Sequence, residues 1–333
     1  MENRSERIKK AIDIVAEFPR TSKKQLGVVL YQRNPLLYKS ADDARTCVRQ
    51  ATGTCGKDFL KNKDTTPYIG FQGVSVHDGE VDPFIPYVIE ENIIGILSDI
   101  HLPYQDNKAL NIALEKCLDE KVDMILLNGD ILDCYQVSYF DKNPTKSSFI
   151  KEVEMMCTFL KDLRRIFGNI KILFKLGNHE ERLERYLMSK APAIFNIECF
   201  NIEKLVEIEY QRLFDEKLIW EVVKNKRVMQ FASLSIVHGH EFGNSFFSPV
   251  NPARGYFMRA KTSILGGHNH QTSEHIESDL NGKIIGAFST GCLCKLNPDY
   301  HPINKWNHGF AIAKRVNNNY NVRNFKIIDG QLV

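Results

Sequence analysis

Five short apolar runs beyond residue 92 each lead directly into side chains that can bind a metal ion. The residues that follow the runs are Asp-Ile-His at 99–101, Gly-Asp at 129–130, Gly-Asn-His-Glu at 177–180, His-Gly-His at 238–240 and Gly-His-Asn-His at 267–270. Six of the ten histidines lie at these junctions. Because open α/β sheets bind ligands beyond the carboxyl ends of their strands, we expect the five junctions to meet in one cleft.

The types of these side chains narrow the choice of metal. Carboxylate, imidazole and one neutral amide oxygen together suit manganese, iron, zinc or nickel better than calcium or magnesium. One carboxylate that bridges two cations makes a site about 3.5–4 Å across, which is the spacing used for in-line displacement at phosphorus. The sequence therefore predicts two divalent metal ions, with manganese as the first candidate, and a phosphate ester as the substrate.

The apolar runs themselves predict an α/β domain. Each has about the length of a buried parallel strand, and helical stretches near residues 108–120 and 149–167 separate the first three. The runs are Ile93–Leu97, Met124–Leu127, Ile172–Phe174, Leu234–Val237 and Ser263–Leu265.

The chain is expected to form two domains, a small basic helical domain with a linker at 1–85 and the α/β domain at 86–333. Residues 54–90 are rich in Gly, Asp, Pro and Thr and are typical of a linker. Residues 1–63 carry about fourteen Lys and Arg against seven Asp and Glu, roughly +7, although the whole chain has a net charge of only +3. This asymmetry favours an anionic partner for the small domain, with a solvated basic surface as the alternative.

Apolar residues at helical spacing, together with capping residues, divide the small domain into helices. Three helices are expected: one from Ser5 to Phe18, one capped by Thr21 or Ser22, and one capped by Ser40. Arg45 and Arg49 are one turn apart on the third helix and would share an exposed face. The arrangement resembles a helix-turn-helix module. A DNA- or RNA-binding module, a protein-docking or oligomerisation module, and a structural cap all remain open for it, as does the oligomeric state.

Composition excludes some classes of protein. No apolar run approaches the roughly 20 residues that span a bilayer, and the polar N-terminus contains no secretory signal, so no membrane partner is expected. The eight cysteines include no CxxC pair, which favours reduced thiols in the cytoplasm. Cys292-Leu293-Cys294 could bind a soft metal. The alternative is a strand on which one of the two thiols faces the core.

The motifs DxH, GDxxD, GNHE, HGH and GHxH occur in this order between about residues 92 and 315. This series resembles the signature of calcineurin-like metallophosphoesterases. The resemblance implies a four-layer α/β sandwich, with two facing β-sheets flanked by helices. The run Gly129–Cys134, the GNHE motif and the small basic domain in front of them are similar to members encoded by bacteriophages and prophages.

The resemblance also implies a role for each matching residue. Seven residues would hold two metal ions: Asp99, His101 and His270 the first, Asn178, His238 and His268 the second, and Asp130 both. A hydroxide bridging the two metals would attack phosphorus opposite the leaving oxygen. His179 would stabilise charge on the phosphoryl oxygens and protonate the leaving oxygen. Asp133 would orient a ligand or His179, as carboxylates behind metal ligands commonly do.

Other residues near the motifs are candidates for contacts with the substrate. Arg182 and Arg254 could clamp a phosphate, and structural roles are equally open for both. His240 would contact the substrate or support a metal ligand. Residues 241–261 are expected to form a loop over the cleft, and residues 184–232 a mostly helical insertion. The segment from Gly291 to Phe310, which includes Tyr300 and Trp306, would either reach the rim of the cleft or pack against the second sheet.

The leading hypothesis is an enzyme that hydrolyses a phosphodiester in nucleic acid or a nucleotide, because the basic small domain can meet backbone phosphates. The first alternative is a phosphomonoesterase that acts on a phosphoprotein or a small molecule. The second is a binding or scaffolding protein that has kept the fold and lost the activity.

Overall fold

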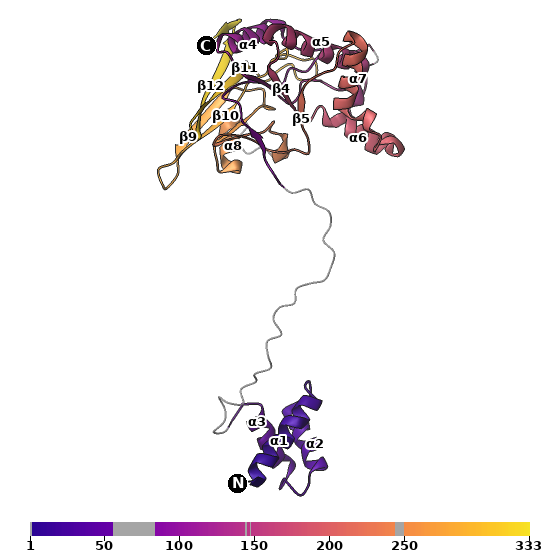
Figure 1. The fold of residues 1–333 in the computed structure, drawn as a ribbon, viewed down its shortest axis with the longest axis vertical. Helices are drawn as coiled ribbons and strands as arrows, with labels where there is room; N and C mark the ends of the chain where they lie inside the picture. The colour runs from indigo at the N-terminus through magenta and orange to yellow at the C-terminus, as the bar shows by residue number, and fades with distance from the viewer. Residues whose placement is uncertain (1, 56–83, 144, 147, 244–249) are drawn as a thin grey trace. The chain divides into compact units, whose positions relative to one another are not determined.

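The computed structural model describes residues 2–55, 84–143, 145–146, 148–243 and 250–333 (Figure 1). The chain forms two compact units, Met1–Val81 and Asp82–Val333. None of the helices in the described ranges is long and apolar enough to cross a membrane.

The first unit contains three helices at the expected places: α1 (Glu2–Glu17), α2 (Lys23–Arg33) and α3 (Ala41–Ala51). Ser22 and Ser40 cap α2 and α3, because each hydroxyl oxygen accepts a hydrogen bond from a backbone N–H three residues on, at 3.3 and 3.2 Å. The three helices bury a shared apolar core that includes Ile14, Leu30 and Val48. The three helices and the caps at Ser22 and Ser40 are therefore confirmed, although α1 begins three residues before the predicted Ser5. The resemblance to a helix-turn-helix module stays a prediction.

Most of the predicted linker, residues 56–83, lies outside the described residues. The last part of the predicted linker forms a strand instead. Strand β1 (Tyr87–Ile89) pairs in parallel with β6 (Met229–Phe231), so these residues belong to a sheet of the second unit.

The second unit contains two β-sheets among its described residues. The seven-stranded sheet runs in the order β13 (Gln331–Leu332), β12 (Asn319–Ile328), β11 (His308–Val316), β2 (Ile93–Leu97), β3 (Met124–Asn128), β4 (Lys171–Lys175) and β5 (Glu221–Val223). The six-stranded sheet runs in the order β1, β6, β7 (Leu234–Ile236), β8 (Ile264–Gly266), β10 (Ile284–Ser289) and β9 (Ser273–Ser278).

All five predicted apolar runs form strands, but they do not share one sheet. Strands β2, β3 and β4 are parallel neighbours in the seven-stranded sheet. Strands β7 and β8 are parallel neighbours in the six-stranded sheet. The carboxyl ends of two groups of strands, one from each sheet, therefore supply the metal-binding motifs.

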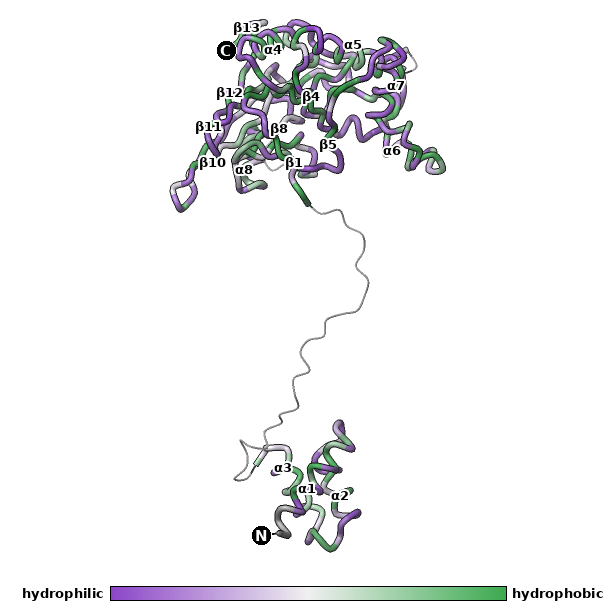
Figure 2. The backbone as a smooth tube through the Cα atoms, in the orientation of Figure 1, coloured by the Kyte–Doolittle hydropathy of each residue, from purple (hydrophilic) through white to green (hydrophobic). Residues whose placement is uncertain are grey.

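Alternating side chains build the layers, because successive residues of a strand point to opposite faces. Ile94 and Ile96 of β2 and Ile236 of β7 belong to one buried core between the two sheets. Leu97 faces the other way, into a core with α4 (Asn107–Asp119), α5 (Phe149–Phe167) and α7 (Ile202–Phe214). Figure 2 shows hydrophobic segments along β4 and β8.

The outer face of the six-stranded sheet is covered by α8 (Pro252–Ala260), which packs through Ala253 and Tyr256 against Ile264 and Ala287. Figure 1 shows α4, α5 and α7 on one side of the unit and α8 on the other. The predicted fold, a four-layer sandwich of two facing sheets flanked by helices, is therefore confirmed.

Two segments differ from the expectation. The stretch predicted as a loop at 241–261 contains helix α8, which begins at Pro252 because Asn251 accepts a hydrogen bond from Arg254 N at 3.0 Å. The stretch predicted as mostly helical at 184–232 includes α7 and most of α6 (Glu181–Lys190), but also β5 and β6. Both strands are only three residues long, which is too short for a clear period-two pattern.

One carboxylate ties α4 to the edge of the seven-stranded sheet. Glu120, directly after α4, lies 2.7 Å from cationic nitrogens of Lys116, Lys314 of β11 and Arg323 of β12. Hydrogen bonds from Lys116 and Lys314 lower the pKa of Glu120 to about 2, although burial opposes the shift. The ordinary pKa of a glutamate is about 4.3, so ionised Glu120 stabilises the folded state above that pH.

We expect Glu120→Gln to lower the free energy of unfolding by about 1–2 kcal/mol at pH 7, a value reduced for screening by solvent. Because the folded-state pKa is depressed, the difference from the unsubstituted protein should shrink as the pH falls from about 4 toward 2. Urea unfolding followed by tryptophan fluorescence measures this in the second unit, since Trp220 and Trp306 both lie there. Glu115→Gln, at an exposed position of the same helix, is the control. An equal loss of stability at pH 7 and pH 3 would contradict the assignment.

Candidate metal centre

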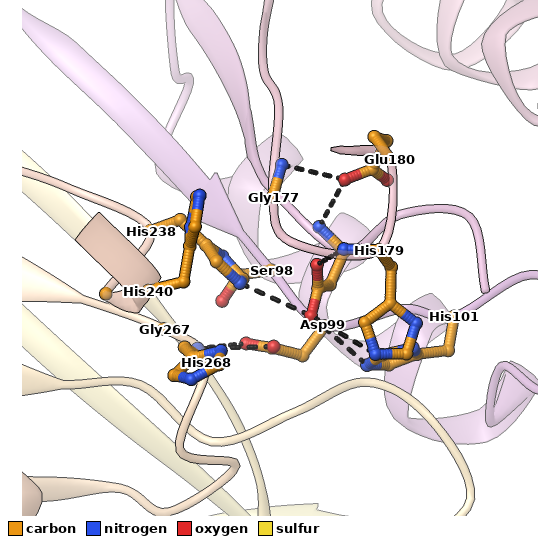
Figure 3. A network of polar contacts seen from close by, with 12 residues as sticks. Ser98, Asp99, His101, Gly177, His179, Glu180, His238, His240, Gly267 and His268 are labelled. Carbon is orange, nitrogen blue, oxygen red and sulfur yellow. Dashed lines mark hydrogen bonds and ion pairs between the residues drawn. The ribbon is translucent and has the colours of Figure 1, made fainter. Parts of the chain in front are cut away.

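The five motifs meet where the carboxyl ends of the two groups of strands come together (Figure 3). Asp130, which follows β3, lies at the middle of the cluster. Its Oδ2 atom is 3.3 Å from Nε2 of His238, 3.8 Å from Nε2 of His179 and 3.9 Å from Nε2 of His101. Asp130 therefore touches residues from both sheets, which is the position that a bridging ligand needs.

The residues predicted for the first metal lie on one side of Asp130. Nε2 of His270 is 3.1 Å from Oδ1 of Asp99 and 3.2 Å from Nε2 of His101. The carboxylate of Asp99 also accepts hydrogen bonds from the backbone N–H of His268, at 2.9 and 3.2 Å. One carboxylate and two imidazole nitrogens thus face one another without an intervening side chain among the described residues.

The residues predicted for the second metal lie on the other side. The ligand atoms of Asp130, His238 and His268 are within 4.8 Å of one another. Asn178 lies between Gly177 and His179, and the backbone N–H of His179 donates to Oδ1 of Asp130 at 2.9 Å.

Two of these ligand atoms have no hydrogen-bond partner in the described part of the chain: Asn178 Oδ1 and His268 Nδ1. Both atoms are buried, and a buried polar atom without a partner costs about 1–3 kcal/mol. Nearly all such atoms in folded proteins are satisfied. Nε2 of His238 faces the Asp130 carboxylate at 3.3 Å. A cation would satisfy the two atoms without partners, so the side chains fit the predicted second metal.

The hydrogen bond made by the other ring nitrogen of His238 also suits a metal ligand. Its Nδ1 lies 2.7 Å from the backbone oxygen of Asn128, which can only accept a hydrogen bond. Nδ1 therefore carries a hydrogen, and Nε2 faces the Asp130 carboxylate at 3.3 Å. A hydrogen bond of this kind on the far nitrogen commonly orients a metal-binding imidazole.

The backbone at the cluster adopts a conformation that most residues avoid. Five of the seven predicted ligands have positive φ angles: Asp99 (56°), His101 (52°), Asp130 (53°), His268 (66°) and His270 (55°). A left-handed backbone costs an L-residue about 1–2 kcal/mol, so it persists only where the surroundings enforce it. The sharp turns bring side chains back over the strand ends.

Two motif glycines allow the loops to approach each other. A Cβ atom on Gly177 would collide with the carboxylate of Asp130, and one on Gly267 would collide with Ser98 and Asp99. The glycines of GNHE and GHxH are therefore required by close packing in the cluster.

Glu180, the last residue of GNHE, has a structural role that the sequence analysis did not assign. Its buried carboxylate accepts hydrogen bonds from the backbone N–H groups of Asp130, Ile131, Leu132 and Gly177 at 2.8–3.0 Å. It thereby ties the loop after β3 to the loop after β4. The sequence signal for this role was the acidic residue at the end of the GNHE motif, because a buried carboxylate needs hydrogen-bond donors around it.

Asp133, His179 and Arg182 form a second group beside the cluster. Oδ1 of Asp133 lies 3.2 Å from Nδ1 of His101 and 3.3 Å from Nδ1 of His179. Arg182 donates to the backbone oxygen of Asp133 and to Nε2 of His179, both at 2.8 Å. Since guanidinium only donates, Nε2 of His179 accepts and Nδ1 donates, to the Asp133 backbone oxygen at 2.9 Å.

The other two predicted substrate contacts lie elsewhere. Nε2 of His240 is 2.8 Å from Oε1 of Glu181, so this imidazole is held by a carboxylate next to Glu180. The side chain of Arg254 is exposed on α8, and no described contact joins it to the cluster. Roles of both residues toward a substrate stay predictions.

The charges in the cluster compensate one another. Burial alone would raise the pKa of Asp99, but the neighbouring His270 lowers it to about 2. Burial lowers the pKa of His270, but Asp99 raises it to about 10. His268 differs, because burial and the charge of His238 lower its pKa to about 4. Ionised carboxylates and a neutral His268 suit a cation, and a cation bound at His270 would displace the proton that this imidazole holds.

The segment from Gly291 to Phe310 brings aromatic side chains near the cluster, and its last residue packs under helices rather than against the second sheet. Phe310 is fully buried in the core beneath α4 and α5. Trp306 packs edge-on against the imidazole of His270, with ring centroids 4.1 Å apart, and Tyr300 lies 6.5 Å from Trp306. Aromatic side chains therefore do reach the neighbourhood of the metal ligands.

Comparison with known proteins agrees with the geometry. The sequence model of the calcineurin-like phosphoesterase family matches residues 93–280. The chain is 25% identical over 231 residues to the Gene 54 protein of Mycobacterium phage L5, covering 66% of this chain and 87% of that protein. It is 23% identical over 184 residues to the Gene 54 protein of Mycobacterium phage D29, covering 54% and 69%. The predicted similarity to phage proteins is thus confirmed.

A crystal structure of a dimetal phosphatase from Danio rerio aligns with a TM-score of 0.37 and 10% identity, covering 70% of this chain and 95% of that one. The family match covers more than half of the chain and includes all seven predicted metal ligands. The chain therefore belongs to the calcineurin-like phosphoesterase family.

Proposed function

We propose that this protein is a metal-dependent phosphodiesterase that cuts nucleic acid or a nucleotide with two divalent cations. The observation that carries the proposal is the pair of buried atoms without partners, on Asn178 and His268, in motifs that meet at the Asp130 carboxylate. Cations would satisfy these atoms, and the proposed hydrolysis depends on bound cations.

The two cation positions have separate ligand sets. Asp99, His101 and His270 would hold the first cation and Asn178, His238 and His268 the second, with Asp130 between them. Two cations held in this way supply Lewis acidity toward the phosphoryl oxygens and lower the pKa of water in the site. The chain supplies the fixed orientation, because each carboxylate is held by backbone N–H groups or imidazoles before any cation binds.

The contacts of His179 and Arg182 support a role for both on the phosphate. Nε2 of His179 is 3.8 Å from the Asp130 carboxylate, and the guanidinium of Arg182 keeps N–H groups available beyond its bonds to His179 and the Asp133 backbone. A phosphoryl oxygen entering the cluster can accept from the guanidinium, which matches phosphate geometry well. Release from Arg182 would free Nε2 of His179 to hold a proton for the leaving oxygen.

Charge and aromatic rings favour nucleic acid as the substrate. The first unit carries exposed cations that have no ion pair among its described residues, including Lys10, Lys24 and Arg49. In the second unit, Lys146 lies 5.7 and 5.1 Å from the rings of Tyr104 and Tyr135, which follow the DxH and GDxxD motifs. Cations bind backbone phosphates without regard to sequence, and aromatic rings can stack on bases.

We expect Asp130→Asn to lower manganese-dependent hydrolysis of bis-p-nitrophenyl phosphate at least about a hundredfold, because a neutral amide cannot bridge two cations. Initial rates over a range of substrate concentrations measure this. Asp119→Asn, at an exposed position on α4, should leave the rate unchanged.

The same assay separates the two candidate activities. A diesterase should have a higher kcat/KM for bis-p-nitrophenyl phosphate than for p-nitrophenyl phosphate. The opposite preference would favour a phosphomonoesterase. No turnover of either ester with manganese, zinc, iron or nickel would refute the proposal of an enzyme.

Arg182→Ala should lower kcat/KM for the diester by about 10–100-fold, the usual effect of removing a partner of a site residue. Arg182→Lys should restore little of it, since one ammonium group cannot reproduce the two-pronged contact with His179 and Asp133. Arg165→Ala, whose side chain is 72% exposed on α5, is the matched control. Equal kcat/KM values for Arg182→Ala and the control would show that Arg182 has no role in hydrolysis.

Nucleic-acid binding by the first unit can be tested in the full chain. The plot of log affinity for duplex DNA against log salt concentration should become shallower by about 2 when the exposed Lys24 and Arg49 are both replaced by Ala, roughly 0.9 for each lost phosphate contact. Arg33→Ala should change the slope less, because Arg33 is already paired with Glu17 at 2.6 Å. An unchanged slope in both variants, and in a chain shortened to residues 86–333, would end the nucleic-acid hypothesis for this unit.

A further inference from the structure

A buried thiol lies beside the first predicted cation position. The Sγ atom of Cys294 and ring nitrogens of His101 and His270 are within 4.8 Å of one another. Cys294 is 3% exposed. The ligand types predicted from the motifs were carboxylate, imidazole and amide, and the thiol is additional to that set.

The backbone around Cys294 is fixed to the loop that carries Asp99 and His101. The N–H of Leu293 donates to the backbone oxygen of Asp99 at 3.0 Å, and the N–H of Lys295 donates to that of Tyr104 at 2.9 Å. Residues on both sides of Cys294 are therefore bonded to the DxH loop. The thiol cannot move far from the cluster without breaking these bonds.

The two cysteines of Cys292-Leu293-Cys294 have different surroundings. Leu293 points into the core beneath α4 and α5, so the two thiols share the opposite face of the extended chain. Sγ of Cys292 lies within hydrogen-bond range of two backbone oxygens, those of Cys294 at 3.9 Å and Asn307 at 3.7 Å. Among the described residues, only the Cys294 thiol belongs to a cluster that could hold a metal.

Two imidazole nitrogens beside this thiol face each other. Nε2 of His101 and Nε2 of His270 lie 3.2 Å apart, and both side chains are buried. Without a cation a proton lies between the two lone pairs, and a bound cation would replace that proton. The carboxylate of Asp99, 3.1 Å from Nε2 of His270, adds the negative charge that a cation prefers.

We propose that the Cys294 thiolate is an additional ligand of the first cation, together with Asp99, His101 and His270, and that this position selects zinc or ferrous iron over manganese. The inference rests on the proposed two-cation site and refines its chemistry. Thiolate is a soft ligand that suits zinc and iron, whereas manganese prefers oxygen ligands. Its charge also offsets more of a divalent charge than a neutral ligand could. Manganese, the first candidate from the sequence, would then be confined to the second position.

Cobalt substitution of the full-length protein tests this without measuring activity. After removal of metal with a chelator, the protein is reloaded with Co²⁺, and the absorption spectrum is recorded. We expect an intense near-ultraviolet band from sulfur-to-cobalt charge transfer, in addition to the weaker visible bands that nitrogen and oxygen ligands also give. Cys294→Ser should lose the charge-transfer band and keep the visible bands. Cys199→Ser, at an exposed cysteine, is the control and should keep both, whereas Cys292 cannot serve as a control because its thiol hydrogen-bonds the imidazole of His270.

Metal competition gives an independent measurement. Cys294→Ser should weaken zinc binding at one of the two sites by more than about tenfold, while manganese affinity changes less. Cobalt bound without a sulfur band in the unsubstituted protein would overturn the role of Cys294 and leave the two-cation proposal standing. No cobalt binding at all would overturn both. Loss of the band in Cys292→Ser but not in Cys294→Ser would overturn the proposal, because the ligand would then be Cys292. Cys294→Ala serves if the serine variant does not fold.

Discussion

Asp99 and Asp130 place two negative charges at the junction of the two sheets, where the side chains are 0% and 1% exposed. An isolated buried carboxylate is so costly that it would normally take up a proton. Here imidazoles and backbone N–H groups surround both carboxylates and keep the pKa of each below its ordinary value, although burial alone would raise it. The ionised state is therefore built into the fold before any ligand arrives. Most other features of the centre can be understood as ways of holding these two charges in place.

The two sheets each contribute part of the centre. The seven-stranded sheet carries both carboxylates, and the six-stranded sheet carries three of the four imidazoles predicted as ligands. Each sheet is anchored separately, by the helices on its outer face and by the core shared between the sheets. The loops between strand and helix absorb the strain, through left-handed residues and through glycines that allow close contact. Rigid layers thus position a cluster that local backbone preferences alone would disfavour.

The centre is also chemically uneven. On one side of Asp130, a carboxylate, two imidazoles and a thiol lie close together. On the other side lie two imidazoles, and Asn178 Oδ1 and His268 Nδ1 lack partners in the described structure. Beyond both, Asp133, His179 and Arg182 form a hydrogen-bonded group that reaches the centre through two imidazoles, those of His101 and His179. In the proposed two-cation centre, unequal ligand hardness on the two sides would give each position its own preference among cations.

The sequence by itself determined the features that depend on neighbouring residues. Strand runs, the serine caps of α2 and α3 and the order of the motifs were predictable, because periodicity and capping are local. Membership of the family followed from those motifs. Only the tertiary structure decided that the five runs divide between two sheets, that Glu180 ties two loops together and that Arg182 bonds His179 while Arg254 stands apart on α8. It also decided that Cys294 rather than Cys292 joins the cluster. These outcomes depend on contacts between residues far apart in the chain, which local patterns do not encode.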